Sequence, residues 1–109
     1  MFKIWVDDLR LPPNETWRWA KSVHEAKLHY IQLGGPQGKP GIVSLDHDAG
    51  SYEFMGGDYI RFLEWLEEKQ YTELWNINAQ FHIHSANPVG RQNMKAIIEH
   101  NGWKEISSV

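Results

Sequence analysis

Apolar runs of strand length alternate with amphipathic segments along the chain. These runs predict five strands, at residues 2–7, 16–20, 42–45, 79–85 and 103–107. The second run alternates Trp17 and Trp19 with polar neighbours, and this period of two is typical of an edge strand with one packed face. Gly41 precedes the third run and Gly50 follows it, which indicates a short strand of a covered sheet.

Three amphipathic segments predict helices. The helices are expected at residues 22–33, 58–70 and 87–101, and loops at 9–15, 36–41, 49–57 and 71–78. Ser22 and Glu25 have the capping-box spacing that begins the first helix. Asp58 is expected to cap the second helix, and Asn87 followed by Pro88 is typical of the start of the third.

The order of these elements predicts the fold class. Strands that alternate with helices form a mainly parallel sheet with helices on its faces. One connection does not fit, because the link from Asp8 to Thr16 is shorter than the roughly dozen residues that a parallel crossover normally needs. The second strand is therefore either connected unusually or not parallel to the first.

Composition narrows the class of protein. We expect one domain over residues 1–109, and the hydrophobic and charged fractions of 41% and 23% fit neither disorder nor a membrane protein. The net charge of −3 argues against non-specific nucleic-acid binding, which depends on accumulated Lys and Arg contacts. The absence of cysteine excludes disulfides and thiolate chemistry. No signal pattern or long apolar run is present, so we expect a cytoplasmic protein without membrane contact.

Reactive side chains follow three of the predicted strands. They are Asp7, Asp8, Asp46, His47, Asp48, His84, Ser85 and Asn87. In an open α/β sheet, ligands bind outside the carboxyl ends of the strands, so these residues define one candidate pocket.

The acids of this pocket predict a metal site. Asp7, Asp8 and Asp46 offer hard oxygen ligands, which suit Mg²⁺ first and Mn²⁺ as the alternative. Without a cation, like-charge repulsion raises the pKa of at least one of them. The alternative for Asp8 is that it caps the loop that follows.

Two histidines of this pocket suit proton transfer. His47 and His84 are the candidates for general base or general acid, because imidazole titrates near neutrality. Asp46 is the alternative nucleophile, through a covalent aspartyl-phosphate. The period of a strand places His82 and His84 on one face and Ser85 on the other, and His82 is the weaker candidate.

Other residues at these strand ends suit a phosphate. Arg10 matches phosphate geometry and directly follows the acid pair, which makes it a better candidate than Arg91. Ser85 offers a hydroxyl, and Asn87 is either a substrate ligand or a pure N-cap. Asp48 is either a supporting acid or a loop cap.

The acid pair, Asp46 and Ser85 resemble the acid pair, phosphoacceptor aspartate and hydroxyl residue of response-regulator receiver domains. A closer resemblance is to the receiver-derived family proposed to process cyclic phosphates. It rests on three motifs, Asp7-Asp8-Leu9-Arg10-x-Pro12, Ser44-Leu45-Asp46-His47-Asp48 and His84-Ser85-Ala86-Asn87-Pro88-Val89-Gly90-x-x-Asn93-Met94. The resemblance implies a flavodoxin-like, receiver-like three-layer sandwich with a mainly parallel five-stranded sheet, in which a loop replaces the helix between the first two strands.

The resemblance also implies a divalent metal at the acids and hydrolysis of a cyclic phosphodiester. Asn93 is assigned to the substrate only by this resemblance. Signalling receivers carry an essential lysine at the end of the fifth strand, whereas Lys104 lies at the other end of that strand here. This departure makes a phosphorylation switch the weaker interpretation.

Two functions follow as expectations. The first is a metal-dependent phosphoesterase that acts on a small phosphorylated substrate, either a cyclic nucleotide or an RNA end with a 2′,3′-cyclic phosphate. The alternative is a catalytically inactive or phospho-accepting receiver-like domain that binds a partner protein or a nucleotide. Histidines at two strand ends favour the first, because a receiver switch does not require them.

Overall fold

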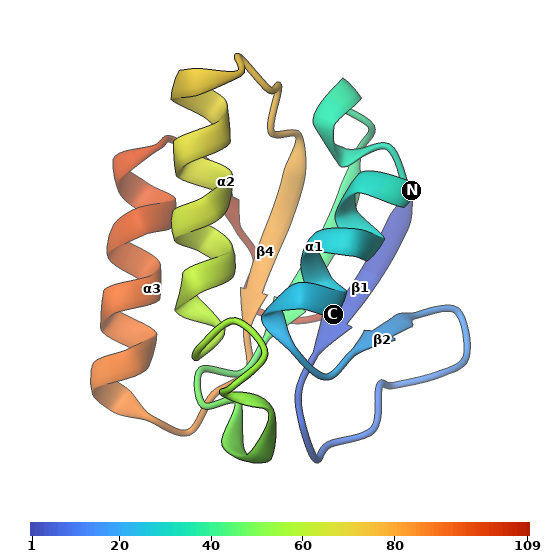
Figure 1. The fold of residues 1–109 in the computed structure, drawn as a ribbon, viewed down its shortest axis with the longest axis vertical. Coiled ribbons are helices and arrows are strands. Elements are labelled where there is room, and N and C mark those ends of the chain that lie inside the picture. The colour runs from blue at the N-terminus through green and yellow to red at the C-terminus, as the bar shows by residue number, and fades with distance from the viewer.

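The computed structural model describes residues 1–109, and its five strands form one sheet in the order β2-β1-β3-β4-β5 (Figure 1). The strands are β1 Phe2–Val6, β2 Arg18–Ala20, β3 Gly41–Leu45, β4 Ala79–Ile83 and β5 Lys104–Glu105. Every neighbouring pair is parallel, so all five carboxyl ends lie at the same edge of the sheet. The predicted parallel sheet and edge position of the second strand are confirmed.

The short link after β1 is an unusual connection to a parallel strand, which resolves the alternative left open by the sequence. Residues 7–17 cross to β2 without a helix, and two tryptophans hold this loop. The Trp5 indole donates to the carbonyl of Arg10 at 2.8 Å, and the Trp19 indole donates to the carbonyl of Asp7 at 2.8 Å. These bonds satisfy loop carbonyls that a helix would otherwise pair internally.

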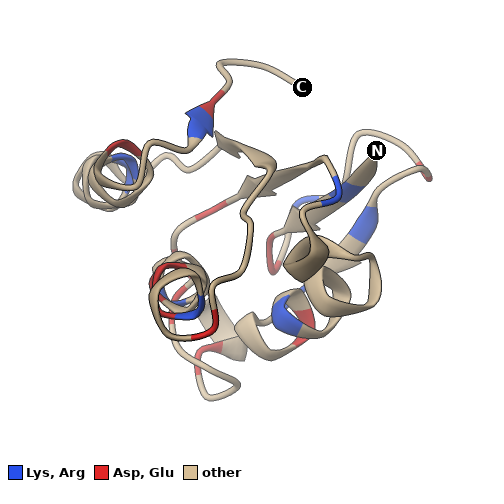
Figure 2. Cartoon of the chain, turned by 90° about the horizontal axis from the view of Figure 1, so that it is seen from above, with Lys and Arg blue, Asp and Glu red and all other residues tan.

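All three helices lie on the same face of the sheet (Figure 2). They are α1 Val23–Gln32, α2 Ile60–Thr72 and α3 Pro88–His100. The connections from β2 to β3, β3 to β4 and β4 to β5 all cross the sheet in one direction, and right-handed crossovers place their helices on one side. The predicted fold class is confirmed, with one correction to its three-layer detail. The opposite face carries no helix and is flanked by the loop after β1 and the C-terminal residues (Figure 2).

Side chains alternate along the strands between the two faces. The helices cover a core to which the central strands contribute Ile4, Val6, Val43, Leu45, Phe81 and Ile83. The intervening residues Trp5, Ser44 and His82 point to the helix-free face, since successive strand residues point in opposite directions. A polar set of side chains therefore lies directly opposite an apolar core.

Helix starts agree with the capping signals. The Ser22 hydroxyl accepts from the Glu25 amide at 3.1 Å, and the Asn87 side chain accepts from the Gly90 amide at 3.0 Å. The second helix differs, because Asp58 does not cap it and residues 71–72, predicted as loop, are helical. None of the helices combines the length and apolar character needed to cross a membrane.

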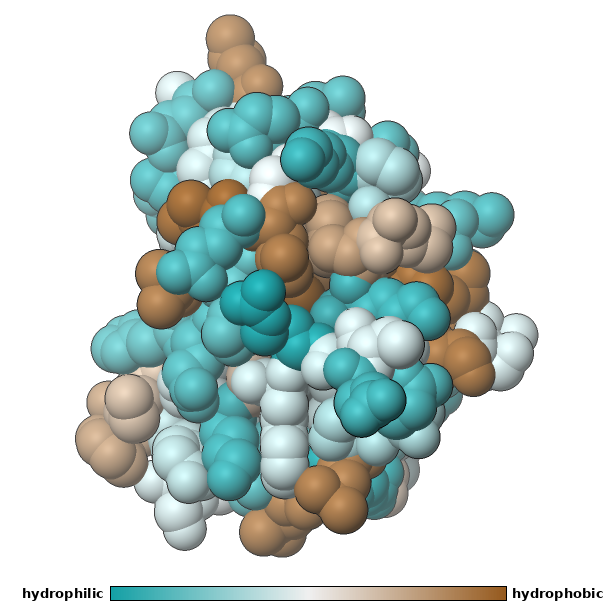
Figure 3. All heavy atoms as spheres, turned by 90° about the vertical axis from the view of Figure 1, so that its right-hand side faces the viewer, coloured by the Kyte–Doolittle hydropathy of each residue, from teal (hydrophilic) through white to brown (hydrophobic).

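Exposed apolar side chains occur in the loops at the carboxyl edge. Leu9 and Leu11 follow β1, and Phe54 lies in the loop after β3. On the side of the molecule at β2, apolar patches are separated by polar residues (Figure 3). This side presents no continuous apolar face.

Candidate functional site

The carboxylates of Asp7, Asp8 and Asp46 converge where β1 and β3 end. One oxygen of each lies within 4.8 Å of the others. The parallel register explains the convergence, because Val6 pairs with Leu45 and the Asp46 amide donates to the Val6 carbonyl at 2.9 Å. The residues that follow the two strands are thereby held side by side. We call these three residues the acid cluster.

The three carboxylates differ in how many of their oxygens remain open. Asp7 is 1% exposed, and its Oδ1 accepts from the amides of Leu9 and Arg10 at 2.8 and 2.9 Å. Asp46 Oδ1 accepts from the His47 amide at 2.8 Å. Asp46 Oδ2 and both oxygens of Asp8 accept no hydrogen bond from another residue. Asp8 and Asp46 therefore offer the open oxygens, and this donor set fits a hard divalent cation.

No Lys or Arg forms an ion pair with the acid cluster. Burial raises the pKa of Asp8 above its usual 3.8, and the charges of Asp7, Asp46 and Asp48 raise it further, against the opposing effect of its own backbone amide. The protein leaves the negative charge of the cluster uncompensated by its own cations. A bound cation would relieve that repulsion. The metal assignment itself stays a prediction.

His84 is enclosed and both of its ring nitrogens are engaged. Its ring stacks on Trp5 with centroids 4.0 Å apart, and its side chain is 9% exposed. Nε2 lies 2.8 Å from Asp7 Oδ2, and Nδ1 lies 2.8 Å from the hydroxyl of Ser44. Burial lowers the pKa of His84, outweighing the opposite effect of Asp7. This geometry suits a residue that holds Asp7 better than one that exchanges protons with a substrate.

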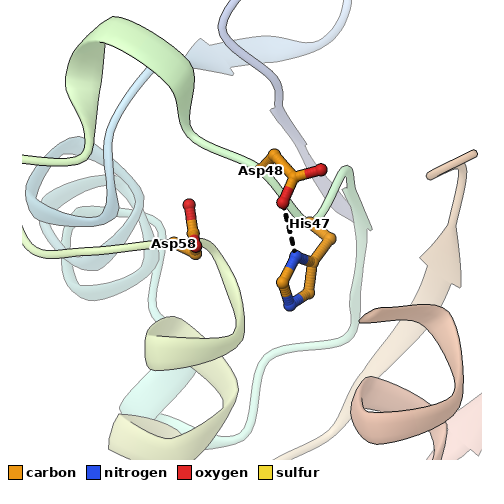
Figure 4. A group of neighbouring side chains, drawn as sticks. All are labelled: His47, Asp48 and Asp58. Atoms are coloured by element: carbon orange, nitrogen blue, oxygen red, sulfur yellow. Dashed lines mark hydrogen bonds and ion pairs between the residues drawn. The ribbon is translucent and has the colours of Figure 1, made fainter. Parts of the chain in front are cut away.

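A second group of side chains consists of His47, Asp48 and Asp58 (Figure 4). His47 Nδ1 lies 2.9 Å from Asp48 Oδ1, and Asp58 lies near the pair, on the segment that leads into α2. One ligand atom of each of these residues lies within 4.8 Å of the others. Gly90 leaves room for His47, because a Cβ at position 90 would overlap the ring. His47 Nε2 has no hydrogen-bond partner, so His47 is the histidine that is free to exchange a proton.

The sequence pattern did not assign Asp58 to this group. Asp58 Oδ1 accepts from the Ala49 amide at 3.0 Å, which folds the loop after β3 back onto its own start. The spacing of nine residues gives no periodic signal. The one signal that could have identified Asp58 is its position as an acidic residue directly after a glycine-rich loop.

The residues assigned to the substrate are only partly brought together. Arg10 is exposed at the rim and donates to the His84 carbonyl at 2.8 Å. Ser85 is buried, and its hydroxyl accepts from the Asn87 amide at 3.1 Å. Asn87 caps α3, and its amide nitrogen also lies 3.5 Å from both oxygens of Asp48. Asn93 is exposed on α3 and makes no hydrogen bond to the others, so the structure does not join it to the group.

None of the surface hollows is lined by the acid cluster. The largest hollow, about 400 Å³, runs along the start of α3 and is lined by Pro88, Arg91, Gln92 and Lys95. Arg91 donates to the carbonyls of Ile83 and Ser85 at 3.0 Å, which ties this hollow to the end of β4.

Residues 2–100 match a protein family described as the cyclic-phosphate processing receiver domain. The chain belongs to this family. No curated protein and no solved structure matches it. The match spans nearly the whole chain, so the resemblance carried by the three motifs is confirmed together with the receiver-like fold.

This receiver domain differs from a signalling receiver in the position of its lysines. Lys104 is exposed at the start of β5, where it pairs in register with Gln80, and so lies toward the opposite edge from the acid cluster. Lys95 instead pairs with Glu105 at 3.7 Å. No lysine takes the place beside Asp46 that neutralises a phosphoryl group in receivers.

Proposed function

We propose that this receiver domain is a metal-dependent phosphoesterase that opens a cyclic phosphate, either in a cyclic nucleotide or at an RNA end. The proposal is carried by the acid cluster, whose carboxylates lie within 4.8 Å without a protein cation. It is supported by the family, which is described by cyclic-phosphate processing.

The acid cluster would hold the cation. Asp8 and Asp46 contribute open oxygens, and Asp7 contributes the remaining lone pair of an oxygen that His84 already holds. A bound divalent cation polarises a phosphoryl oxygen and lowers the pKa of bound water. Asp7 is fixed by two backbone amides and one imidazole, so it serves as the rigid member of the set.

His47 is assigned the proton transfer. Its free Nε2 takes a proton from the attacking water while the water oxygen bonds to phosphorus. The P–O bond to one ring oxygen then breaks, and His47 returns the proton to that oxygen. The products are a phosphomonoester and a free hydroxyl. Asp48, 2.9 Å from Nδ1, orients the ring and stabilises its protonated form.

Arg10 is assigned to the phosphate. One guanidinium nitrogen is anchored on the His84 carbonyl at 2.8 Å, and its other N–H groups remain available for phosphate oxygens. The Ser85 hydroxyl accepts from the Asn87 amide and so keeps its own proton free to donate.

Turnover of a defined panel tests the proposal. The panel contains 2′,3′-cyclic nucleotides, 3′,5′-cyclic nucleotides and an RNA with a 2′,3′-cyclic phosphate end, each with Mg²⁺ or Mn²⁺. We expect hydrolysis of at least one member, loss of that activity in Asp46→Asn, and full activity in Glu99→Gln. Glu99 is a matched control, because it is an exposed acid on α3 outside the site.

The alternative function has a different signature. A phospho-accepting domain would be labelled at Asp46 by acetyl phosphate without catalytic release. A purely binding domain would bind the cation or a nucleotide and turn over nothing. Either result across the whole panel refutes the phosphoesterase proposal.

A further inference from the structure

A chain of hydrogen bonds runs along the helix-free face from the acid cluster into the sheet. Asp7 Oδ2 lies 2.8 Å from His84 Nε2, and His84 Nδ1 lies 2.8 Å from Ser44 Oγ. The same Ser44 oxygen lies 2.7 Å from His82 Nδ1. The parallel register creates this chain, because Ser44 pairs directly with His82 and both point to the same face.

We propose that Ser44 and His82 are positioning residues for the acid cluster, acting through the tautomer of His84. They hold His84 with its proton on Nε2, so that the ring donates to Asp7 and keeps that carboxylate in place. This inference deepens the proposed function, since it concerns the same carboxylates. Its central measurement does not depend on turnover.

The donor and the acceptor of each hydrogen bond in this series follow from counting the available protons. An ionised Asp7 only accepts, so His84 must donate from Nε2. The Nδ1 of a neutral ring is then an acceptor and needs the Ser44 hydroxyl proton. The Ser44 oxygen in turn accepts from Nδ1–H of His82. Three protons fill the three gaps when both rings are neutral and His82 carries its proton on Nδ1.

The position of Ser44 favours an orienting role. Ser44 is 0% exposed and lies between apolar neighbours in the central strand, where Val43 and Leu45 are equally buried. Its hydroxyl has no partner except the two imidazoles. A buried polar network rigidifies the structure and specifies one arrangement of its side chains when every member is satisfied. An orienting role accounts for a hydroxyl and two imidazoles at this place.

These hydrogen bonds hold the second oxygen of the Asp7 carboxylate. Two amides hold its Oδ1 and His84 holds its Oδ2, which leaves one lone pair of Oδ2 without a hydrogen-bond partner. Residues that orient a metal ligand typically change metal affinity by about 10- to 100-fold. Loss of the Ser44 hydroxyl or of the His82 donor should therefore weaken cation binding without removing any ligand.

Nitrogen NMR of the protein labelled with ¹⁵N-histidine tests the tautomer directly at neutral pH. We expect His84 to be protonated at Nε2 and bare at Nδ1 in the wild type. Ser44→Ala and His82→Phe should mix or reverse this tautomer. His82→Asn should restore it, because the Asn amide can donate from nearly the position of Nδ1. Gln80→Leu is the matched control, two residues earlier on the same face of β4 and outside the chain.

Mn²⁺ titration of the same variants gives the second measurement. Ser44→Ala and His82→Phe should bind Mn²⁺ about 10-fold more weakly, while His82→Asn and Gln80→Leu retain the wild-type affinity. The inference is overturned if wild-type His84 carries its proton on Nδ1 or on both nitrogens, or if Ser44→Ala changes neither tautomer nor affinity. If Ser44→Ala fails to fold, the inference is decided by whether His82→Phe and His82→Asn differ in His84 tautomer and Mn²⁺ affinity.

These outcomes separate the inference from the proposed function. A wild-type protein that binds Mn²⁺ but hydrolyses no panel member refutes the phosphoesterase and leaves the positioning role standing on its tautomer and affinity. If the wild type binds no Mn²⁺, the proposed function fails and the tautomers of the variants alone decide the inference.

Discussion

Asp8→Asn should stabilise the protein in the absence of metal and abolish its stabilisation by Mg²⁺. Asp8 accepts no hydrogen bond from another residue, and its pKa is raised by burial and by three neighbouring carboxylates, so its ionised form is held at a cost. Two unit charges at the 4.8 Å that bounds the cluster repel by about 0.9 kcal/mol at the dielectric constant of water and by about 3.5 kcal/mol at an effective value near 20.

The partial exposure of Asp8 favours the lower part of that range. We therefore expect a gain of about 1–2 kcal/mol for metal-free Asp8→Asn at neutral pH. For a chain of this size, each kcal/mol raises Tm by about 4–8 °C. Removing the same charge at Glu99 should change Tm little, because Glu99 is exposed and lies outside the cluster.

The sign of the pH dependence is fixed by the raised pKa. The penalty is fully present above the pKa of folded Asp8, and it disappears as the pH falls below the usual value of 3.8. The Tm difference between Asp8→Asn and wild type should therefore be largest near neutrality and vanish in acid.

Thermal unfolding with EDTA and with millimolar Mg²⁺ provides the assay. Wild type should be the less stable protein in EDTA and gain stability with Mg²⁺, as a ligand that binds only the folded state requires. Asp8→Asn should be more stable in EDTA and indifferent to Mg²⁺. If Asp8→Asn lowers Tm in EDTA, or if Mg²⁺ shifts wild type and variant equally, the reasoning about the acid cluster is wrong.

Three further substitutions test other parts of the site. Gly90→Ala should cost about 1–3 kcal/mol and lower activity, because the new methyl group overlaps the ring of His47; an unchanged denaturation midpoint would contradict the close packing. His47→Gln should lower kcat by about 10²–10⁴-fold with little change in KM, and steady-state kinetics showing the reverse split would reject its role as proton carrier. Trp5→Ala should destabilise by about 3 kcal/mol and expose the amides of residues 7–17 to hydrogen exchange, since its ring covers His84 and its indole holds the loop; protection equal to wild type would count against this.

Local signals were sufficient for most elements of the fold. Ser22 and Asn87 cap their helices as the sequence indicates, since capping depends on residues three positions apart. The direction of β2 depended on bonds between distant residues, such as the indole of Trp19 on the carbonyl of Asp7, twelve positions away. No periodicity in residues 7–17 reports such a contact. The usual length of a parallel crossover therefore left both an unusual connection and a non-parallel strand open, and the structure has the unusual connection.

The acid cluster was predictable because strand ends converge in any parallel sheet. The environment of His84 was not, because the ring packs between Trp5 of β1 and Ser44 of β3, and its surroundings follow from a register that the sequence does not state. The alternation rule did place His82 and His84 on one face. A serine inside an apolar strand was the signal that, joined to the register, would have revealed the chain of hydrogen bonds.

The charge balance of the site bears on the choice between switch and enzyme. A phosphoryl group adds about two negative charges at neutral pH. On Asp46 it would stand beside Asp7 and Asp8, and no Lys or Arg forms an ion pair with these acids. A divalent cation would offset only part of that charge, so a phosphorylated Asp46 should be less stable than in a receiver with its lysine. The same arrangement suits a phosphate that arrives on the substrate and leaves with the product, because no charged state has to persist on the protein.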